Sequence, residues 1–552
     1  MNHLSPLERL PLELLAHTLL PHLPLPSLLS LRLCSRTLRS AVEEHLPSVL
    51  RSLGYAPCTI AHLPFHRHAP AARKALWATS VVRRFEAQEF RGSVLGGQRG
   101  GWRKCLPVVK LWEPVAGEGA LLVARGRGME LWHADPSAGG GMRGADVLVD
   151  GFDGGRREEA AGATKDVTAL CGGIGLGEVT VARVDGTLSR LRVRSDERRA
   201  GGGGGGCVRL AEKARYDAFP SASAGGKTAG RSSTIQALAS EGGVLAAAGT
   251  TRLPPGSVAA SAPATPAPAS PFSSRPSTPS ASLPSLAASL SSRAVSSSHS
   301  ISLHALASPW QPPEVVPLST KPWSLLLSPS SSSASAAASP SWLAIGHTGI
   351  SPLSLLPLTP SGPLPSALQP LSHTRKTTSV YALASPPSSS PLSPSHTVIA
   401  AFYDSTTRVF DLRVPPPSSS SSSSWNDGDD DFRPANEIAR LADPWSDDPS
   451  YSLACGGPSG SAVFVGTARN AALRIFDLRS ASRSSSITAY APGRDRSPVY
   501  SLAAEGSRVY GATESRGFVL DWDPWPERAA EGVAFVRHSE GGAMRWSDGR
   551  GV

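Results

Sequence analysis

The feature of this chain that most constrains its fold is a recurring pattern of short apolar stretches from residue 106 onward. The stretches are rich in Val, Ile, Leu and aromatic residues, and Gly, Ser, Pro and Asp separate them, as is typical of strands joined by tight turns. One strand type returns at intervals along the chain, which is the mark of an internal repeat. This first strand begins at Val167, Ile235, Trp323, Val380, Tyr451 and Val499. The pattern favours a mainly β fold.

Each repeat continues beyond its first strand in a similar way. A strand of small residues follows, as at Val398 and Val463, and a third strand ends in an apolar–charged pair such as Phe410-Asp411. A fourth strand with polar edges is expected each time, including residues 533–536 in the last repeat. Counted from residues 108–150, the repeats number seven, and seven four-stranded sheets are commonly found closed into a ring that exposes no long sheet edge.

The repeats resemble those of a degenerate WD-repeat β-propeller over residues 101–540. Phe410-Asp411 and Phe476-Asp477 stand at the family's Trp-Asp position, and Asp404 and Asp185-Gly186 stand at its tight turn between the second and third strands. The family's Gly-His pair is missing, and Phe mostly replaces Trp, so the blade boundaries are set less firmly than the architecture. A β-rich sandwich or two smaller β domains are the alternatives.

A second feature lies at residues 10–39, where about a dozen leucines fall into three short helix-like pieces separated by prolines. Pro26 suits the first turn of the second helix, and Ser35 suits the N-cap of the third. Three helices of this size bury too little surface to be stable alone. They therefore need a partner or a neighbouring domain.

This N-terminal stretch, assigned to residues 5–46, resembles an F-box. Leu10, Pro11 and Glu13 match the family's opening Leu-Pro-x-Glu, and the run from Cys34 to Arg39 matches its closing segment, with small departures at Cys34 and Leu38. The resemblance implies a surface that docks on the adaptor of a ubiquitin ligase. The residues expected to contact the adaptor or to support that contact are Leu10, Pro11, Leu14, Leu15, Leu28 and Leu31. The alternative is a Leu-rich helical hairpin that packs on its own domain.

The remaining segments divide into connectors and low-complexity loops. Residues 47–100 are predicted to form a helical connector, with one helix over 47–53 and another over 70–89. Serine, proline and alanine dominate residues 254–300, 328–340, 386–395 and 415–424. Segments of this composition bury too little apolar area to offset their ordering entropy, so we expect disordered insertions between the strands.

Composition and motifs narrow the classes of function. Six cysteines without Cys-x-x-Cys spacing are typical of a reducing compartment and argue against a structural zinc site. Charges interrupt the leucine-rich segment, so no membrane span is expected. The net charge is +10, but the arginines are spread along the chain, which argues against nucleic-acid binding. No recognisable catalytic motif is present, so we expect a non-enzyme without metal or cofactor.

The order of F-box, connector and propeller resembles the substrate receptors of SCF-type cullin–RING ubiquitin ligases. The resemblance implies a cytoplasmic or nuclear protein whose F-box docks on the adaptor and cullin scaffold. The propeller would then bind an unknown client protein, with a phosphorylated or acidic segment as one candidate for recognition. The alternative function is a propeller scaffold for protein–protein assembly outside any ligase, because the fold alone does not determine function.

Overall fold

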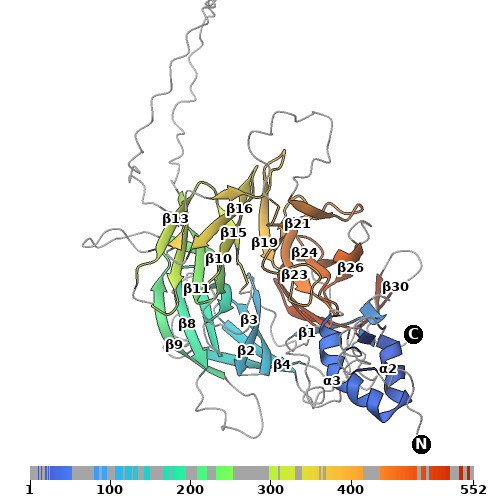
Figure 1. The fold of residues 1–552 in the computed structure, drawn as a ribbon. Coiled ribbons are helices and arrows are strands. Elements are labelled where there is room, and N and C mark those ends of the chain that lie inside the picture. Colours follow the sequence, from blue (N-terminus) through green and yellow to red (C-terminus); the bar gives the residue numbers. More distant parts are fainter. Residues whose placement is uncertain are drawn as a thin grey trace, which may run out of the picture.

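The fold is known from a computed structural model. It describes residues 10–52 and 80–95 with gaps, 106–522 with gaps, 534–538 and 544–547; the longer gaps within 106–522 are 150–165, 194–207, 220–231, 253–296, 330–338 and 415–435. Strands dominate the described chain, and nearly all of them pair antiparallel to a neighbour in sequence (Figure 1). The fold is therefore mainly β, as the repeat pattern predicts.

The strands form a series of consecutive four-stranded units, each running from an inner to an outer strand. The inner strands are β2 (Val108–Val115), β6 (Val167–Gly172), β10 (Ser232–Glu241), β14 (Pro322–Leu327), β19 (Thr378–Ala384), β23 (Ser450–Gly456) and β27 (Val499–Glu505). The second strands are β3 (Glu118–Arg125), β7 (Glu178–Arg183), β11 (Val244–Arg252), β15 (Trp342–Gly349), β20 (Thr397–Phe402), β24 (Ala462–Thr467) and β28 (Arg508–Thr513).

The outer half of each unit follows the same order. The third strands are β4 (Gly128–Ala134), β8 (Thr187–Val193), β12 (Ser297–Ala305), β16 (Leu353–Thr359), β21 (Thr407–Asp411), β25 (Ala472–Asp477) and β29 (Gly517–Asp521). The outer strands are β5 (Met142–Val149), β9 (Val208–Asp217), β13 (Glu314–Leu318), the short β18 (Gln369–Pro370), β22 (Glu437–Leu441), β26 (Ile487–Tyr490) and β1 (Phe90–Leu95). A two-residue strand, β17 (Gly362–Pro363), also pairs with β16.

The units close into a ring. Each inner strand contacts the inner strand of the next unit, and β27 returns to contact β2. Serine hydroxyls join neighbouring inner strands: Ser324 Oγ donates to the carbonyl of Val380 at 3.1 Å, and Ser452 Oγ donates to the carbonyl of Val499 at 2.6 Å. The amide of Val109 donates to Ser501 Oγ at 3.0 Å across the closing contact. This ring of antiparallel sheets is the architecture of a β-propeller.

The closing unit corrects two sequence-based assignments. Its fourth strand is β1, which pairs with β29 although it lies within residues 47–100, the predicted helical connector. The C-terminal strand β30 (Ala534–His538), predicted as that fourth strand, instead pairs with the other edge of β1, and β31 (Met544–Ser547) follows it. Strand pairing between distant segments depends on tertiary structure, so the local pattern of residues 533–536 does not reveal its partner.

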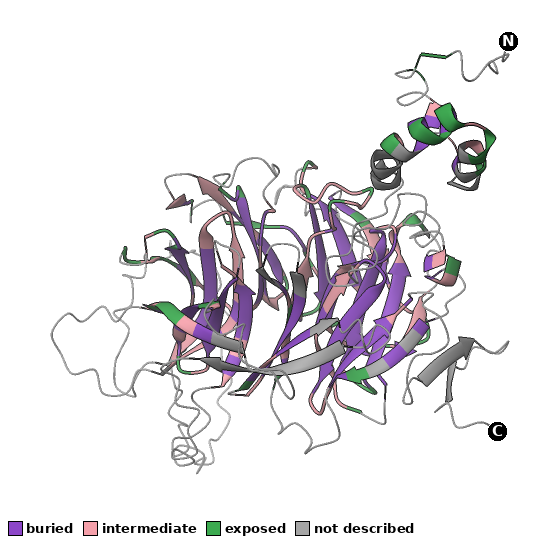
Figure 2. Ribbon diagram, turned by 90° about the horizontal axis from the view of Figure 1, so that it is seen from below, coloured by how far each residue is buried: buried purple, intermediate pink, exposed green. Residues whose placement is uncertain are grey.

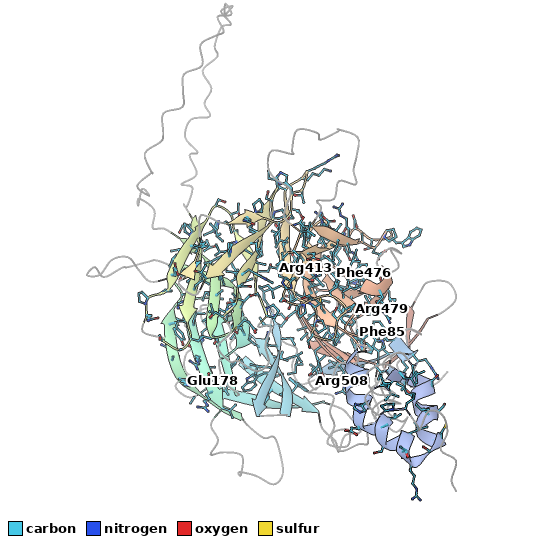
Figure 3. The ribbon with its side chains drawn as sticks, viewed as in Figure 1. Phe85, Glu178, Arg413, Phe476, Arg479 and Arg508 are labelled. Carbon is cyan, nitrogen blue, oxygen red and sulfur yellow. The ribbon has the colours of Figure 1, made fainter. Side chains whose placement is uncertain are left out.

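The core lies between neighbouring sheets, and Figure 2 shows buried positions along the strands of the ring. Part of the predicted connector helix joins this core: Val81 and Phe85 are buried, and the Phe85 ring lies 5.4 Å from Trp522 and 6.4 Å from Phe464 between centroids (Figure 3). The segment before β1 is therefore packed against the ring. Residues 53–79 lie outside the described chain.

The turns that carry the WD-like residues are well formed. Asp185 Oδ1 accepts the Thr187 amide at 3.0 Å, and Asp404 Oδ1 accepts the Thr406 amide at 3.1 Å. Phe410 and Phe476 are buried, and the acids after them bind arginines two residues on, with Asp411 and Arg413 joined at 2.6 Å (Figure 3). The hydrogen bond from Arg413 holds the pKa of Asp411 below its usual value. These local pairs end the third strands.

The low-complexity loops do not all behave as predicted. Residues 386–395 are ordered: the Ser390 amide donates to the Pro387 carbonyl at 2.9 Å, and the Trp342 indole donates to the Ser395 carbonyl at 3.0 Å. Leu392 also packs against the apolar core. Contacts of this kind offset the conformational entropy that the loop loses on ordering, and the composition of the loop does not reveal them. The predicted insertion 254–300 ends earlier than expected, since Ser297 begins β12. Residues 254–296, 330–338 and 415–424 lie outside the described chain.

Candidate functional site

Two helices are described in the N-terminal region, α2 (Leu25–Cys34) and α3 (Arg36–Ser52) (Figure 1). Ser35 separates them and caps α3, because its Oγ accepts the Leu38 amide at 3.1 Å, as the sequence predicts. Pro26 lies in the first turn of α2. Leu28 of α2 and Leu38 and Val42 of α3 are buried, and the two helices contact each other. A small apolar interior thus holds α2 and α3 together.

The predicted adaptor-contact residues divide into an exposed and a buried group. Leu10 and Leu14 are 43% and 52% exposed, and Pro11 is exposed as well. Leu28 is fully buried and Leu31 is half-buried, so these two support the helices from inside. Nothing is described of the side chain of Leu15.

Leu33 belongs to the exposed group although it is not among the predicted adaptor-contact residues. Its side chain is 73% exposed near the end of α2. The local sequence alternates leucine with polar residues here, and only the packing of α2 on α3 decides which leucines remain outside. Leu10, Leu14 and Leu33 are called the exposed leucines below.

A second candidate surface lies on the ring, where the inner strands begin. The pairing register of β14, β19, β23 and β27 with their second strands is interrupted by one residue at or before the middle of each strand. A bulge of this kind re-aims the side chain of the extra residue. The extra residues in these strands are Trp323, Tyr381, Tyr451 and Tyr500.

These bulge residues form a continuous series of ring contacts. Tyr381 lies 4.8 Å from Trp323 and stacks on Tyr451 at 4.9 Å with an interplanar angle of 6°, and Tyr451 meets Tyr500 edge-on at 6.1 Å. Tyr403, in the turn between β20 and β21, adds a ring 5.6 Å from Tyr381. We call these five residues the aromatic rim. Four are partly exposed, and Tyr403 is 46% exposed.

Polar contacts hold the rim in place. The Trp323 indole donates to Thr348 Oγ1 at 2.8 Å, and Lys321 Nζ lies 3.8 Å from the centre of the Trp323 ring. Burial lowers the pKa of Lys321. Burial, together with the nearby hydroxyls of Tyr451 and Tyr403, raises the pKa of Tyr381, so this phenol stays protonated at neutral pH.

One loop beside the rim carries the most exposed aromatic side chain that the structure describes, Trp445 at 93%. The buried Arg474 fixes this loop: its guanidinium donates to Ser446 Oγ at 2.6 Å and to the Ser405 carbonyl at 3.4 Å. Asp443 lies 3.8 Å from the same guanidinium and accepts the Trp445 amide at 3.0 Å. The indole is therefore presented on a hydrogen-bonded turn.

The aromatic rim is not predicted as a surface by the sequence pattern. The aromatic residues recur near the starts of the first strands, but alternation along a regular strand would turn each of them towards a neighbouring sheet. The signal that was present is the recurrence of Trp or Tyr in four successive repeats. The bulge that brings these rings into contact with one another follows from strand pairing.

Other kinds of site find no support in the described part of the chain. None of its helices is long and apolar enough to cross a membrane. Among the same residues, no group of three or more His, Cys, Asp or Glu side chains is placed to hold a metal ion.

No protein-family model matches the chain, and no curated protein matches it in sequence. One structurally similar solved protein is the β-propeller domain of Cps50 (Swd1) from Myceliophteria thermophila, at 11% sequence identity and a TM-score of 0.42. That alignment covers 78% of this chain and 99% of the solved one.

Proposed function

We propose that this protein is the substrate-recognition subunit of an SCF-type ubiquitin ligase, built from an F-box and a seven-bladed WD-repeat propeller. In this assignment each four-stranded unit of the ring is one blade. The helices α2 and α3, with the segment before them, dock on the adaptor and so on the cullin. The propeller binds the client protein, and the receptor contributes proximity rather than covalent chemistry.

This proposal rests mainly on the solvent exposure of Leu10, Leu14 and Leu33. A hairpin that packed on its own domain would cover its apolar side chains, whereas an adaptor-docking surface leaves them accessible. Leu10, Leu14 and Leu33 are 43%, 52% and 73% exposed, while Leu28 and Val42 are fully buried. Figure 2 shows α2 and α3 to one side of the ring, with exposed residues along both helices. Exposed leucines on and beside a small helical pair favour a partner surface.

The connector geometry supports the same assignment. Phe85 lies in the apolar core formed with Phe464 and Trp522, and β1 begins shortly after it and pairs into the closing sheet. This segment is therefore fixed to the ring at the propeller end of the connector. A receptor needs such a restraint, because the position of the client relative to the transfer site depends on it.

Co-purification of the adaptor and cullin with the full-length protein tests the proposal. Wild-type protein is expected to retain both. The triple variant Leu10→Ala, Pro11→Ala, Leu14→Ala is expected to lose both, because it removes apolar contacts with the adaptor. The variant should still fold, because all three side chains are exposed. A matched control replaces the exposed large hydrophobics Ile438 and Tyr490, on β22 and β26, with Ala. A well-folded wild-type chain that retains no adaptor would reject the ligase function in favour of a scaffold outside any ligase.

A further inference from the structure

The aromatic rim and Trp445 lie on one face of the ring. Loops that precede inner strands meet turns between second and third strands there: the Tyr403 amide donates to the Ser379 carbonyl at 2.8 Å, and the Ala468 amide donates to the Pro449 carbonyl at 2.8 Å. The Glu514 amide likewise donates to Ser497 Oγ at 3.0 Å. These hydrogen bonds lie within single units. The ring contacts of the aromatic rim join each of these units to the next, so the loops around β14, β19, β23 and β27 form one surface, which we call the rim face.

The side chains of the rim face are of the types that dominate protein–protein contacts. Trp, Tyr and Arg are enriched among residues whose loss costs most binding energy. Trp445 and Tyr403 are 93% and 46% exposed, and both stand on hydrogen-bonded turns. Trp and Tyr side chains have only two rotatable bonds, so they lose little freedom on binding and contact with them is favourable. The rim face therefore fits a polypeptide with apolar or aromatic anchor residues.

The charge of the rim face identifies the partner further. Its described loops and strand ends carry eight basic and five acidic side chains, a net charge of +3. Three of the acids already lie in ion pairs, Asp404 with Arg408, Asp443 with Arg474 and Asp448 with Arg469. The basic side chains are Lys321, Arg375, Lys376, Arg408, Arg469, Arg474, Arg496 and Arg516, and the acidic ones are Asp404, Asp443, Asp447, Asp448 and Glu514.

From these observations we propose that the rim face binds an extended, acidic polypeptide segment, with Trp445, Tyr403 and the aromatic rim contacting its apolar side chains. The proposal rests on the proposed function, in which the propeller binds the client, and it names the chemistry of that client. The basic residues around the rim attract the carboxylates on either side of the apolar anchors.

The distribution of the basic side chains favours carboxylates spread along a segment over a single phosphate. These basic side chains come from separate places in the chain: Lys321 precedes β14, Lys376 precedes β19, Arg496 precedes β27, and Arg516 lies in the turn between β28 and β29. A phosphate group is bound by several donors that converge on one point. Basic residues from separate loops instead suit several charges at intervals along a chain.

The test uses full-length protein and three labelled peptides in fluorescence anisotropy. In the first peptide glutamate alternates with leucine and tyrosine, in the second glutamine replaces each glutamate, and in the third one phosphoserine is the only acidic residue. The first peptide is expected to bind at least about tenfold more tightly than the second, with affinity falling as salt is raised. The double variant Trp445→Ala, Tyr403→Ala is expected to weaken that binding by about tenfold or more.

Matched variants keep the result specific. Replacing Ile438 and Val315 with Ala changes two exposed hydrophobics near the starts of the outer strands β22 and β13, and it should leave binding unchanged. Replacing Lys376 and Arg496 with Glu reverses their charge and should weaken binding of the glutamate peptide. The same replacement of Arg36 on α3 should leave binding unchanged. Circular dichroism of each variant verifies folding.

Each outcome decides the proposal. Equal binding of the glutamate and glutamine peptides, no binding of either, or binding that ignores the loss of Trp445 and Tyr403 would overturn it. Tighter binding of the phosphoserine peptide would overturn the assignment to carboxylates. Adaptor co-purification is measured on the same proteins: peptide binding without adaptor rejects the ligase function alone, and adaptor retention without peptide binding rejects the rim-face inference alone.

Discussion

At the scale of single residues, a glycine paired with a serine determines how closely two sheets approach. Gly346 and Gly466 occupy equivalent places in β15 and β24, and a Cβ at either would run into the serine hydroxyl that bridges to the next inner strand. The same Cβ would also meet Val380 or Val499 of the neighbouring unit. Glycine is needed at these places for space, because the bridging hydrogen bonds of Ser324 and Ser452 lie there.

Gly466→Ala is therefore expected to lower the free energy of unfolding by about 1–3 kcal/mol, the usual cost of overpacking a core. Urea denaturation of the full-length protein measures it. Gly128→Ala in β4 is the matched control, since its Cβ would meet only the Arg125 carbonyl at 3.7 Å. A cost for Gly466→Ala no greater than that of the control would contradict the close approach of these sheets.

His304 gives a pH dependence at the same scale. It is buried, its Nε2 lies 3.1 Å from Ser302 Oγ, and its ring meets Tyr216 edge-on at 5.6 Å. Burial lowers its pKa to about 4 from the ordinary 6.5. The unfolded chain then binds more protons than the folded chain between these values, so the stability from neutral His304 is complete above pH 6.5 and lost as pH falls towards 4.

The expected loss from His304 over this pH range is about 3 kcal/mol, from about 1.4 kcal/mol per pKa unit. Thermal unfolding between pH 7 and pH 4 compares wild type with His304→Gln, which cannot titrate. The variant should start less stable and lose less stability on acidification. Parallel curves for the two proteins would show that His304 titrates normally in the fold.

At the scale of elements, β1 has a larger role than its sequence indicates. It pairs with β29 on one edge and with β30 on the other, so the ring closes through a strand that precedes every other strand of the ring in the chain. Residues 90–95 are short and contain Gly92, which gives them little apolar alternation. The edge of β29 stabilises this strand, because a partner that lies far along the chain supplies the hydrogen bonds.

Gly92 pairs with Leu520 of β29 and Ala534 of β30, so its amide lies between two partner strands. Gly92→Pro is expected to lower the free energy of unfolding by about 3 kcal/mol, because proline removes the amide donor and fits poorly inside a sheet. Val94→Ala is the control, since Val94 is 43% exposed on the same strand. Chemical denaturation of both proteins decides whether β1 closes the ring.

At the scale of the whole molecule, the chain presents two surfaces with different chemistry. The exposed leucines lie before and within α2, and the rim face lies on the loops around β14 to β29. The two surfaces share no residue. A receptor of the proposed kind requires both surfaces, because one binds the ligase adaptor and the other binds the client.

Reconstituted ubiquitin transfer to a fusion protein that carries the glutamate peptide tests this division. The triple variant at Leu10, Pro11 and Leu14 should lose transfer and keep peptide binding. The Trp445→Ala, Tyr403→Ala variant should lose transfer and keep the adaptor. Each loss is expected to reach about tenfold or more, the effect of removing central contacts. Transfer that survives either change would show that the surface concerned does not take part.

Most elements of the ring were predictable from sequence because their signals are local. The strands at Val167, Val380, Tyr451 and Val499 begin within a residue or two of the predicted places, since alternation of apolar side chains and Gly, Pro or Asp turns needs no distant partner. The Ser35 cap likewise depends on residues within one turn. The candidate adaptor residues were chosen from motif order alone, and their contact with an adaptor stays a prediction.

The sequence by itself therefore determined a mainly β repeat fold preceded by leucine-rich helices. Tertiary structure alone decided that β1 closes the ring, that residues 386–395 are ordered, and that Leu33 stays outside while Leu28 is buried. It also decided the aromatic rim, because a bulge exists only where two strands pair. The physical reason is the same in each case: periodicity and turn chemistry act between neighbours in the chain, whereas register, burial and ring closure depend on segments that are far apart in it.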